Sequence, residues 1–409
     1  VLAYTRSIDA VPNAIRKYCR EGVEPQQLLP EIMSMQIVVS TVNLAARFSN
    51  LGEGIPKGHF DVLCIDECGH CTEPEVIGVA ASLMKFHGKR PGQMVMAGDP
   101  NQLGAIVTSE ICRKFGMGVS YMERLVKESP AYSTKDGAGN ISYPPELVTL
   151  LVRNYRSHPA ILKLPNEMFY NNKLVASGDH MTTHSMVKWE HLPSNSKIPV
   201  VFHSVDGENQ RESNSPSWFN VEEALTAVEY VELLVRRSRP SVSQDDIGII
   251  TPYARQVQKI GLALREKNLS GIKVGSVETF QGQERRCIII STVRSEQSLL
   301  SHDQKYNLGF VANEKRFNVA VTRAKALLIV IGNPRVLATD KKNWLPFLRY
   351  CRDNQSWKGA EEWDDAEVES QDELDLLVNE EHEESKLPDE DNWEIVPDQV
   401  PQGYINREE

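Results

Sequence analysis

The sequence predicts an α/β protein with two parallel sheets. Short runs rich in Val and Ile alternate with longer amphipathic stretches along most of the 409 residues. Strands that are apolar on both faces are typical of a parallel sheet covered by helices. Two groups of such runs flank residues 128–146, which are rich in Gly, Pro, Ser and Asn. This composition is typical of a linker or surface loop, so we place a domain boundary there.

Strand-like runs are expected in both groups. The first group holds residues 37–41, 61–65 and 94–97, and the second holds residues 199–205, 247–251, 274–277, 287–293 and 327–331. Residues 219–237 have a helical period, and Asn220 followed by Glu223 has the spacing of an N-terminal cap with a reciprocal Glu. Residues 176–198 and 206–218 are expected to be irregular.

The resulting domain plan has four parts. We predict a partial first domain at 1–130, a linker at 131–146, a second domain at 147–360 and an acidic tail at 361–409. The tail contains 20 acidic and 2 basic residues, whereas the rest of the chain contains 36 acidic and 43 basic residues. We expect the tail to be disordered. Trp363 and Trp393 lie in this tail. Either they belong to short peptides that dock into a partner, or they have no specific role.

The cysteines and the apolar stretches bear on the cellular setting. Seven cysteines, an odd number, are spread from Cys19 to Cys351 without the pattern of a disulfide framework. Cys64, Cys68 and Cys71 lack a second ligand pair at zinc-finger spacing, so we expect no zinc site. No stretch reaches the roughly 18 continuous apolar residues of a membrane helix. The expected location is the cytoplasm, including ribonucleoprotein granules.

The strongest local signal is an acidic pair at a strand end. The apolar run 62–65 leads directly into Asp66 and Glu67. Ligands of open parallel sheets bind at the carboxyl ends of strands. One carboxylate there could hold Mg²⁺, and the next could orient or deprotonate an attacking water. The alternative is an ordinary strand that ends in polar residues, because so short a motif often occurs by chance.

A second strand end repeats this pattern. The run 94–97 is followed by Gly98, Asp99, Pro100, Asn101 and Gln102. Gly98 permits close backbone approach and Pro100 ends the strand. Gln102 offers a neutral side chain that could sense a phosphate oxygen or a water. The alternative is a simple turn.

Two arginines and one loop complete the candidates. Arg156 lies in the segment 153–159 (RNYRSHP), and Arg323 follows an apolar stretch with little polar surface. A guanidinium group can neutralise charge on a transferring phosphoryl group, although a structural salt bridge is the ordinary alternative. The loop 274–284 combines Gly, Ser, Thr, Gln and Glu after a strand, which suits contact with phosphates or sugar hydroxyls.

Taken in this order, the pieces resemble the motifs of superfamily-1 helicases of the nonsense-mediated-decay type. The resemblance covers residues 30–352, and passages at 202–203, 214–220 and 307–310 resemble the Armitage and Moloney-virus-resistance branch. The segments that match motifs II to VI are DECGH at 66–70, GDPNQL at 98–103, NYRSHP at 154–159, VETFQGQE at 277–284 and NVAVTR at 318–323. Cys68 stands where many relatives carry Ala, and His70 stands for a frequent Gln.

The resemblance implies two RecA-like domains, the first of them truncated here, with ATP and Mg²⁺ bound between them. The catalytic residues would be Glu67 as base, Gln102 as coupling residue, and the two arginine fingers. The implied roles, residue by residue, are Mg²⁺ binding for Asp66, arginine fingers for Arg156 and Arg323, nucleotide contact for Tyr155 and Glu284, and nucleic-acid contact for Ser40, Thr41, Ser276 and Thr279.

The resemblance also implies a function. It implies ATP-dependent movement along single-stranded RNA from the five-prime toward the three-prime end, a role in small-RNA silencing, and Argonaute-type partners. A non-catalytic RNA- or protein-binding adaptor and a DNA helicase remain alternatives. No phosphate-binding loop is present, since Gly88-Lys89 continues with Arg90-Pro91. We therefore expect that loop to precede this chain, and the chain alone to be inactive.

Overall fold

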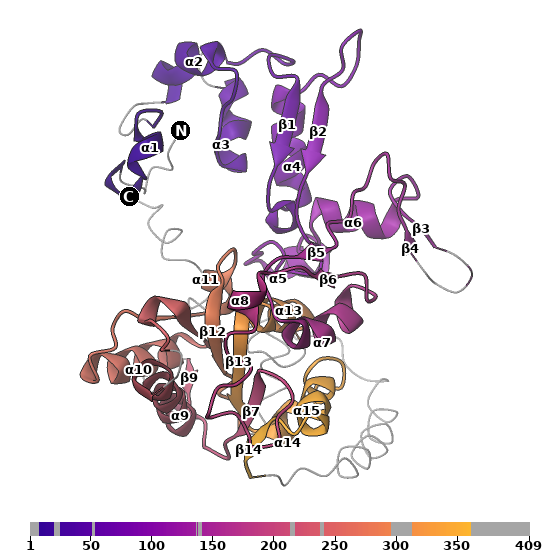
Figure 1. Cartoon of the computed structure of the whole chain (residues 1–409). Coiled ribbons are helices and arrows are strands. Elements are labelled where there is room, and N and C mark those ends of the chain that lie inside the picture. Colours follow the sequence, from indigo (N-terminus) through magenta and orange to yellow (C-terminus); the bar gives the residue numbers. More distant parts are fainter. Residues whose placement is uncertain are drawn as a thin grey trace. The chain divides into compact units, whose positions relative to one another are not determined.

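The computed structural model describes residues 8–19, 25–50, 54–135, 137, 141–212, 217–237, 241–295 and 313–360. The acidic tail, with Trp363 and Trp393, and the passages 214–216 and 307–310 lie outside the described residues. The chain divides into two compact units between Thr149 and Leu150. Each unit is an α/β structure (Figure 1). The predicted fold class is confirmed, with a parallel sheet in each unit.

The first unit is built around two parallel strands. Cys64 of one strand is level with Val95 of the other. Helices of the unit cover one face, where Ile65, Val76 and Val79 share an apolar cluster. The elements are η1 (Ile8–Ala10), α1 (Asn13–Arg16), α2 (Pro25–Ser34), α3 (Val42–Arg47), η2 (Phe48–Asn50), β1 (Val62–Ile65), η3 (Cys68–His70), α4 (Glu73–Leu83), β2 (Gln93–Met96), α5 (Glu110–Lys114), α6 (Tyr121–Glu128), β3 (Thr134–Lys135) and β4 (Ile141–Ser142).

One predicted strand of this unit is wrong. Residues 37–41 do not form a β-strand, and helix α3 begins at Val42. Ile37 and Val39 are 83% and 79% exposed. A β-strand requires a hydrogen-bonded neighbour as well as a suitable composition. The Val- and Ile-rich composition of these residues was therefore not sufficient to predict a strand.

The second unit contains a six-stranded parallel sheet. Its order is β11-β10-β12-β13-β7-β14. The elements are β5 (Arg153–Asn154), α7 (Pro159–Phe169), β6 (Val175–Ala176), α8 (His180–Thr183), β7 (Val200–Ser204), β8 (Gln210–Arg211), β9 (Trp218–Phe219), α9 (Val221–Glu232), the π-helix η4 (Leu233–Arg237), η5 (Gln244–Asp246), β10 (Ile247–Ile250), α10 (Ala254–Glu266), β11 (Lys273–Gly275), α11 (Val277–Phe280), β12 (Arg285–Ser291), α13 (Glu314–Val321), β13 (Ala324–Gly332), α14 (Pro334–Leu337), α15 (Trp344–Asp353) and β14 (Trp357–Gly359).

Helices cover both faces of this sheet. Ile329 of β13 packs with Val231 of α9 and Ile260 of α10. The next residue toward the N-terminus, Leu328, shares the other face with Phe317 of α13. Helices α9 and α10 are drawn on one side of the sheet and α7 and α15 on the other (Figure 1). The alternation explains why the strands are apolar on both faces.

Of the two capping hydrogen bonds predicted at the start of helix α9, one is confirmed and the other is wrong. The Asn220 side chain accepts a hydrogen bond from the Glu223 backbone N–H at 3.0 Å, as the sequence predicts. The Glu223 carboxylate does not return to the cap. It accepts from the Ser291 hydroxyl at 2.6 Å and from the Val293 backbone N–H at 2.9 Å. Ser291 is the last residue of β12 and Val293 follows that strand. Both are distant from Glu223 in sequence, so the spacing rule could not reveal them.

This burial makes the stability of the second unit sensitive to pH. Glu223 is fully buried, and burial raises its pKa from 4.5 to about 7. Between pH 4.5 and about 7, Glu223 keeps its proton in the folded protein but has lost it in the unfolded chain. The contribution of this proton to the free energy of unfolding is complete below pH 4.5 and is lost as pH rises through about 7. Glu223→Gln stays neutral. As pH rises across this window, the free energy of unfolding of Glu223→Gln should therefore gain about 3 kcal/mol relative to that of the native chain.

Urea unfolding over a series of pH values measures this difference. The exposed neighbour Glu222 supplies the matched control, and Glu222→Gln should follow the native pH dependence. Parallel pH curves for Glu223→Gln and the native chain would contradict the assigned proton.

In the described part of the chain, no helix has both the length and the apolar character needed to cross a membrane.

Candidate functional site

The two polar strand ends of the first unit lie side by side. Strands β1 and β2 are parallel neighbours, with Ile65 level with Met96. The Ala97 N–H donates to the Ile65 carbonyl oxygen at 2.9 Å, and the Cys68 N–H donates to the Ala97 carbonyl oxygen at 2.7 Å. These bonds extend the pairing past the strands. The acidic pair and the segment that begins at Gly98 therefore lie side by side beyond the end of the sheet.

Two glycines allow this close approach. A Cβ on Gly98 would lie 2.9 Å from the Gly69 nitrogen and 3.0 Å from the Cys68 nitrogen. A Cβ on Gly69 would lie 3.0 Å from the Asp99 carbonyl oxygen. Backbone atoms cannot move aside as a flexible side chain can, so any other residue would push the two loops apart. The close approach predicted at Gly98 is present.

Glu67 has a backbone conformation that few side chains adopt. Its φ of 51° and ψ of 38° are left-handed, and its N–H donates to the Asp66 carboxylate at 3.0 Å. A left-handed residue other than glycine costs about 1–2 kcal/mol. Such strain is found at sites where the side chain is needed in one direction. Both carboxylates are exposed to solvent.

The Gln102 side chain is held by Asp99, for which the sequence analysis predicted no role. Its amide nitrogen donates to the Asp99 carboxylate at 2.9 Å, and the other Asp99 oxygen accepts from the Asn101 N–H at 2.9 Å. Asp99 thus fixes the turn that presents Gln102. The signal for this was present, since Asp followed two residues later by a turn residue is typical of an Asx-turn.

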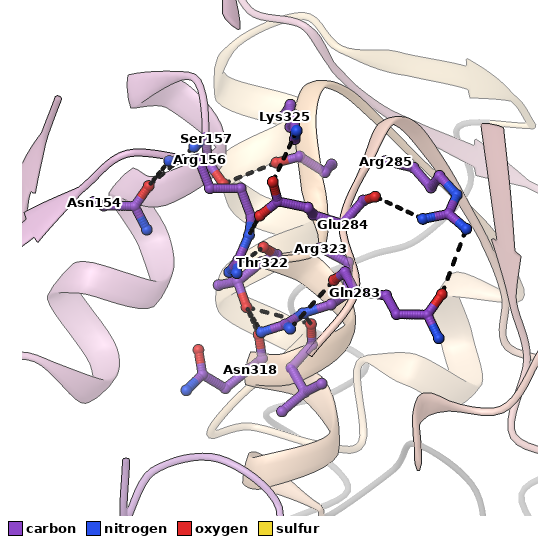
Figure 2. A network of polar contacts seen from close by, with 12 residues as sticks. Asn154, Arg156, Ser157, Gln283, Glu284, Arg285, Asn318, Thr322, Arg323 and Lys325 are labelled. Atoms are coloured by element: carbon purple, nitrogen blue, oxygen red, sulfur yellow. Dashed lines mark hydrogen bonds and ion pairs between the residues drawn. The ribbon is translucent and has the colours of Figure 1, made fainter. Parts of the chain in front are cut away.

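In the second unit, the Glu284 carboxylate forms ion pairs with two basic side chains, Arg156 and Lys325. Figure 2 shows the Glu284 carboxylate between the two basic side chains. Arg156 Nε donates to Glu284 Oε2 at 2.6 Å, and Lys325 Nζ lies 2.8 Å from Glu284 Oε1. Burial opposes ionisation of Glu284, but hydrogen bonds from Lys325 and Arg156 prevail and lower the pKa of its carboxyl group. The sequence indicated Arg156 and Glu284 separately and missed Lys325.

Three elements bring this cluster together. Arg156 precedes α7, where the Asn154 side chain accepts from the Arg156 and Ser157 N–H groups. The Ser157 hydroxyl donates to the Ala324 carbonyl oxygen at 2.8 Å. Glu284 directly precedes β12. The cluster therefore lies at the amino-terminal ends of β12 and β13, beside Asn154, Arg156 and Ser157 (Figure 2).

Arg323 lies next to this cluster and is 2% exposed. Its Nε donates to the Val319 carbonyl oxygen at 3.0 Å, and its other nitrogens lie near the Gln283 carbonyl oxygen and the Thr322 hydroxyl (Figure 2). These contacts hold the guanidinium plane in one orientation. An Arg156 side-chain nitrogen also donates to the Thr322 carbonyl oxygen at 3.4 Å, so both arginines contact Thr322.

The remaining candidates lie on exposed or half-buried surface. Tyr155 is 68% exposed beside Arg156. Thr41 precedes α3, and the Ser40 hydroxyl contacts the Thr41 carbonyl oxygen at 3.2 Å. Ser276 caps α11 by accepting from the Thr279 N–H at 3.4 Å. Ser276 and Thr279 therefore belong to one short helix, while Ser40 and Thr41 belong to the other unit.

The polar residues described above differ in chemistry between the two units. The first presents the oxygen ligands that Mg²⁺ prefers, on Asp66 and Glu67. These exposed carboxylates fit a hydrated divalent cation. The second presents guanidinium groups, which form paired hydrogen bonds with phosphate oxygens. Each unit by itself thus offers groups that occur in phosphoryl transfer: carboxylates that suit a metal and a base in the first, and cationic side chains in the second.

Comparison with known protein families bears on both units. The AAA-domain family matches residues 14–110 with one sequence model and residues 117–335 with another. The second match alone spans more than half of the chain. The chain belongs to the AAA-domain family.

Relatives of this AAA-domain chain are helicases by name. Human RNA helicase Mov10l1 is 44% identical over 83% of this chain. The Danio rerio helicase mov-10-B.1 is 43% identical over 88%, and the Drosophila melanogaster "Probable RNA helicase armi" is 38% identical over 86%. The assignment to the Armitage and Moloney-virus-resistance branch is confirmed. The AAA-domain chain spans 27%, 36% and 31% of the length of these three relatives.

A solved structure shows a more distant likeness. The arterivirus nonstructural protein 10 helicase is 15% identical, with a TM-score of 0.29, over 66% of this chain and 38% of that chain. The family assignment therefore depends on the sequence matches.

Proposed function

We propose that the full-length protein containing this chain is an ATP-dependent RNA helicase or translocase. The observation that carries the proposal is that one unit has adjacent acids at the end of β1, while in the other Arg156 contacts the Thr322–Arg323 turn that leads into β13. A protein that only binds RNA needs neither set. Relatives named as RNA helicases support the same reading.

In this proposal the first unit supplies the metal site and the base. Asp66 would hold Mg²⁺, which would neutralise charge on the ATP phosphates. Glu67 would accept a proton from the attacking water, since its side chain is exposed and directed by a strained backbone. Gln102, held by Asp99, would contact the γ-phosphate side and couple it to the RNA.

The second unit would supply the cations. Arg156 and Arg323 would act as arginine fingers, which stabilise charge that develops during phosphoryl transfer. Glu284 would contact the nucleotide, and its ion pairs with Arg156 and Lys325 would keep both cations near the phosphates. Tyr155 would lie against the adenine, because its ring is exposed beside the first arginine.

RNA would contact both units. Ser40 and Thr41 in one unit, and Ser276 and Thr279 in the other, offer hydroxyl groups that suit phosphate and sugar oxygens. We propose movement from the five-prime toward the three-prime end, cytoplasmic action in small-RNA silencing, and Argonaute-type partners. The chain alone should not hydrolyse ATP, because it contains no phosphate-binding loop.

ATP hydrolysis by the full-length protein tests this proposal. We expect single-stranded RNA to raise the rate of phosphate release well above the rate without nucleic acid, and single-stranded DNA of the same sequence to raise it less. Stimulation by DNA alone would support a DNA helicase instead. RNA binding without hydrolysis would support a non-catalytic adaptor and overturn the proposal.

A further inference from the structure

Two cysteines frame the turn that follows the acidic pair. Cys68 begins the short helix η3 and Cys71 directly follows its last residue, and the Cys71 N–H donates to the Cys68 carbonyl oxygen at 3.1 Å. This bond closes a Cys-x-x-Cys turn immediately before helix α4, which begins at Glu73. The spacing and the closed turn bring the two residues to one side of the chain.

Their surroundings place both sulfur atoms in one region. Cys68 is 0% exposed and belongs to the apolar cluster of the first unit, and Cys71 is half-buried against the same cluster. Cys64 is exposed on β1, whereas its neighbours Leu63 and Ile65 pack on the cluster. Cys71 is therefore open to small reagents, Cys68 is shielded behind it, and Cys64 alternates to the other face of the strand.

The two thiols interact directly. The Cys68 side chain hydrogen-bonds to Cys71, which lowers the pKa of the Cys71 thiol, while partial burial and Glu75 oppose that shift. Cys71 therefore holds more of the reactive thiolate form than an ordinary cysteine does. A partially exposed cysteine beside a second, buried cysteine is the typical arrangement of a redox-sensitive pair.

We propose that Cys68 and Cys71 form a reversible disulfide, so that this turn is a redox-modification site adjoining Asp66 and Glu67. The oxidant is a peroxide. The Cys71 thiol loses its proton, its sulfur attacks one oxygen of hydrogen peroxide, and the O–O bond breaks. The leaving hydroxide takes up that proton and departs as water, which leaves a sulfenic acid on Cys71. The Cys68 sulfur then attacks the Cys71 sulfur, the S–O bond breaks, and the leaving hydroxide takes the Cys68 proton. Two thiols and one peroxide give one disulfide and two waters.

The bond would act on the acidic pair through the backbone. A disulfide fixes its two sulfur atoms about 2.05 Å apart and restrains the torsion angles of both residues. Cys68 directly follows the left-handed Glu67, and its N–H bonds to the Ala97 carbonyl oxygen. We therefore expect the disulfide to lower ATP turnover. This effect rests on the proposed function, whereas formation of the bond does not.

Mass spectrometry of the full-length protein tests the bond. The protein is treated with hydrogen peroxide, its free thiols are alkylated, and it is digested with trypsin. The peptide of residues 58–85 contains Cys64, Cys68 and Cys71. We expect it to carry one alkyl group, on Cys64, and to have lost two hydrogen atoms, and dithiothreitol should restore three alkyl groups. Three alkyl groups after oxidation, or a disulfide that includes Cys64, would overturn the proposal.

Two variants separate this site from other thiol chemistry. Cys64→Ser should form the disulfide as the native protein does. Cys68→Ala removes the partner, so Cys71 should proceed to sulfinic acid without forming an internal disulfide. Unfolding midpoints of the reduced proteins check that both variants fold. An internal disulfide at Cys71 in the Cys68→Ala variant would assign the partner elsewhere and overturn the pair.

RNA-stimulated ATP hydrolysis tests the consequence. Peroxide should lower the rate of the native protein several-fold, dithiothreitol should restore it, and the rate of Cys68→Ala should respond much less. Equal rates for the oxidised and reduced native protein would overturn the coupling to Glu67. If neither form hydrolyses ATP, the proposed function fails, and the peptide masses still decide whether the disulfide exists.

Discussion

Replacing Glu67 with Gln should lower RNA-stimulated ATP hydrolysis of the full-length protein by about 10²–10⁴-fold, the usual contribution of a general base. Glutamine has nearly the same shape as glutamate but cannot accept the proton of the attacking water. ATP and RNA binding should persist, because Asp66 and the arginines are unchanged. Single-turnover hydrolysis and equilibrium binding of a fluorescent ATP analogue measure the two effects separately.

The fold should tolerate this substitution. The Glu67 side chain is exposed, and the left-handed backbone costs glutamine about what it costs glutamate. Glu128, exposed at the end of α6, provides the matched control, and Glu128→Gln should retain the native rate. Equal hydrolysis rates for Glu67→Gln and the native protein would remove Glu67 from the role of base.

Features set by neighbouring residues were predicted well from the sequence. The run that ends at Asp66 is a strand, the Asn220 cap is present, and Gly98 lies against another backbone. Each depends on residues a few positions apart, so composition and spacing carry the information. The parallel sheets also followed from a local property, the apolar residues on both strand faces.

Features set by distant partners were not predictable. Glu223 bonds to Ser291 at the end of β12 and to Val293 just after it instead of its own helix cap, and residues 37–41 do not form a strand. In the site, Lys325 and Asp99 became visible only as partners of Glu284 and Gln102. A sequence shows which side chains carry charge, but the pairing of distant charges depends on tertiary packing.

The Arg323→Ala substitution should lower RNA-stimulated hydrolysis by about 10³–10⁵-fold, the contribution of an arginine finger. Arg323 is buried, and carbonyl oxygens of Val319 and Gln283 hold its guanidinium group, so the cation enters the reaction with little loss of side-chain entropy. Arg323→Lys keeps the charge and loses the planar fork. It should recover little of the rate, because a lysine cannot form the same paired hydrogen bonds.

Stability must be measured beside the rate, since a buried Arg also supports the fold. Arg335 on α14 is exposed, and Arg335→Ala should change neither the unfolding midpoint nor the rate. A finger predicts that Arg323→Lys has a near-native midpoint and a greatly reduced rate. If the rates of Arg323→Lys and Arg323→Ala fall only in proportion to unfolded protein, Arg323 is a structural residue. Arg156, whose ion pair with Glu284 is more exposed, would then be the remaining finger candidate.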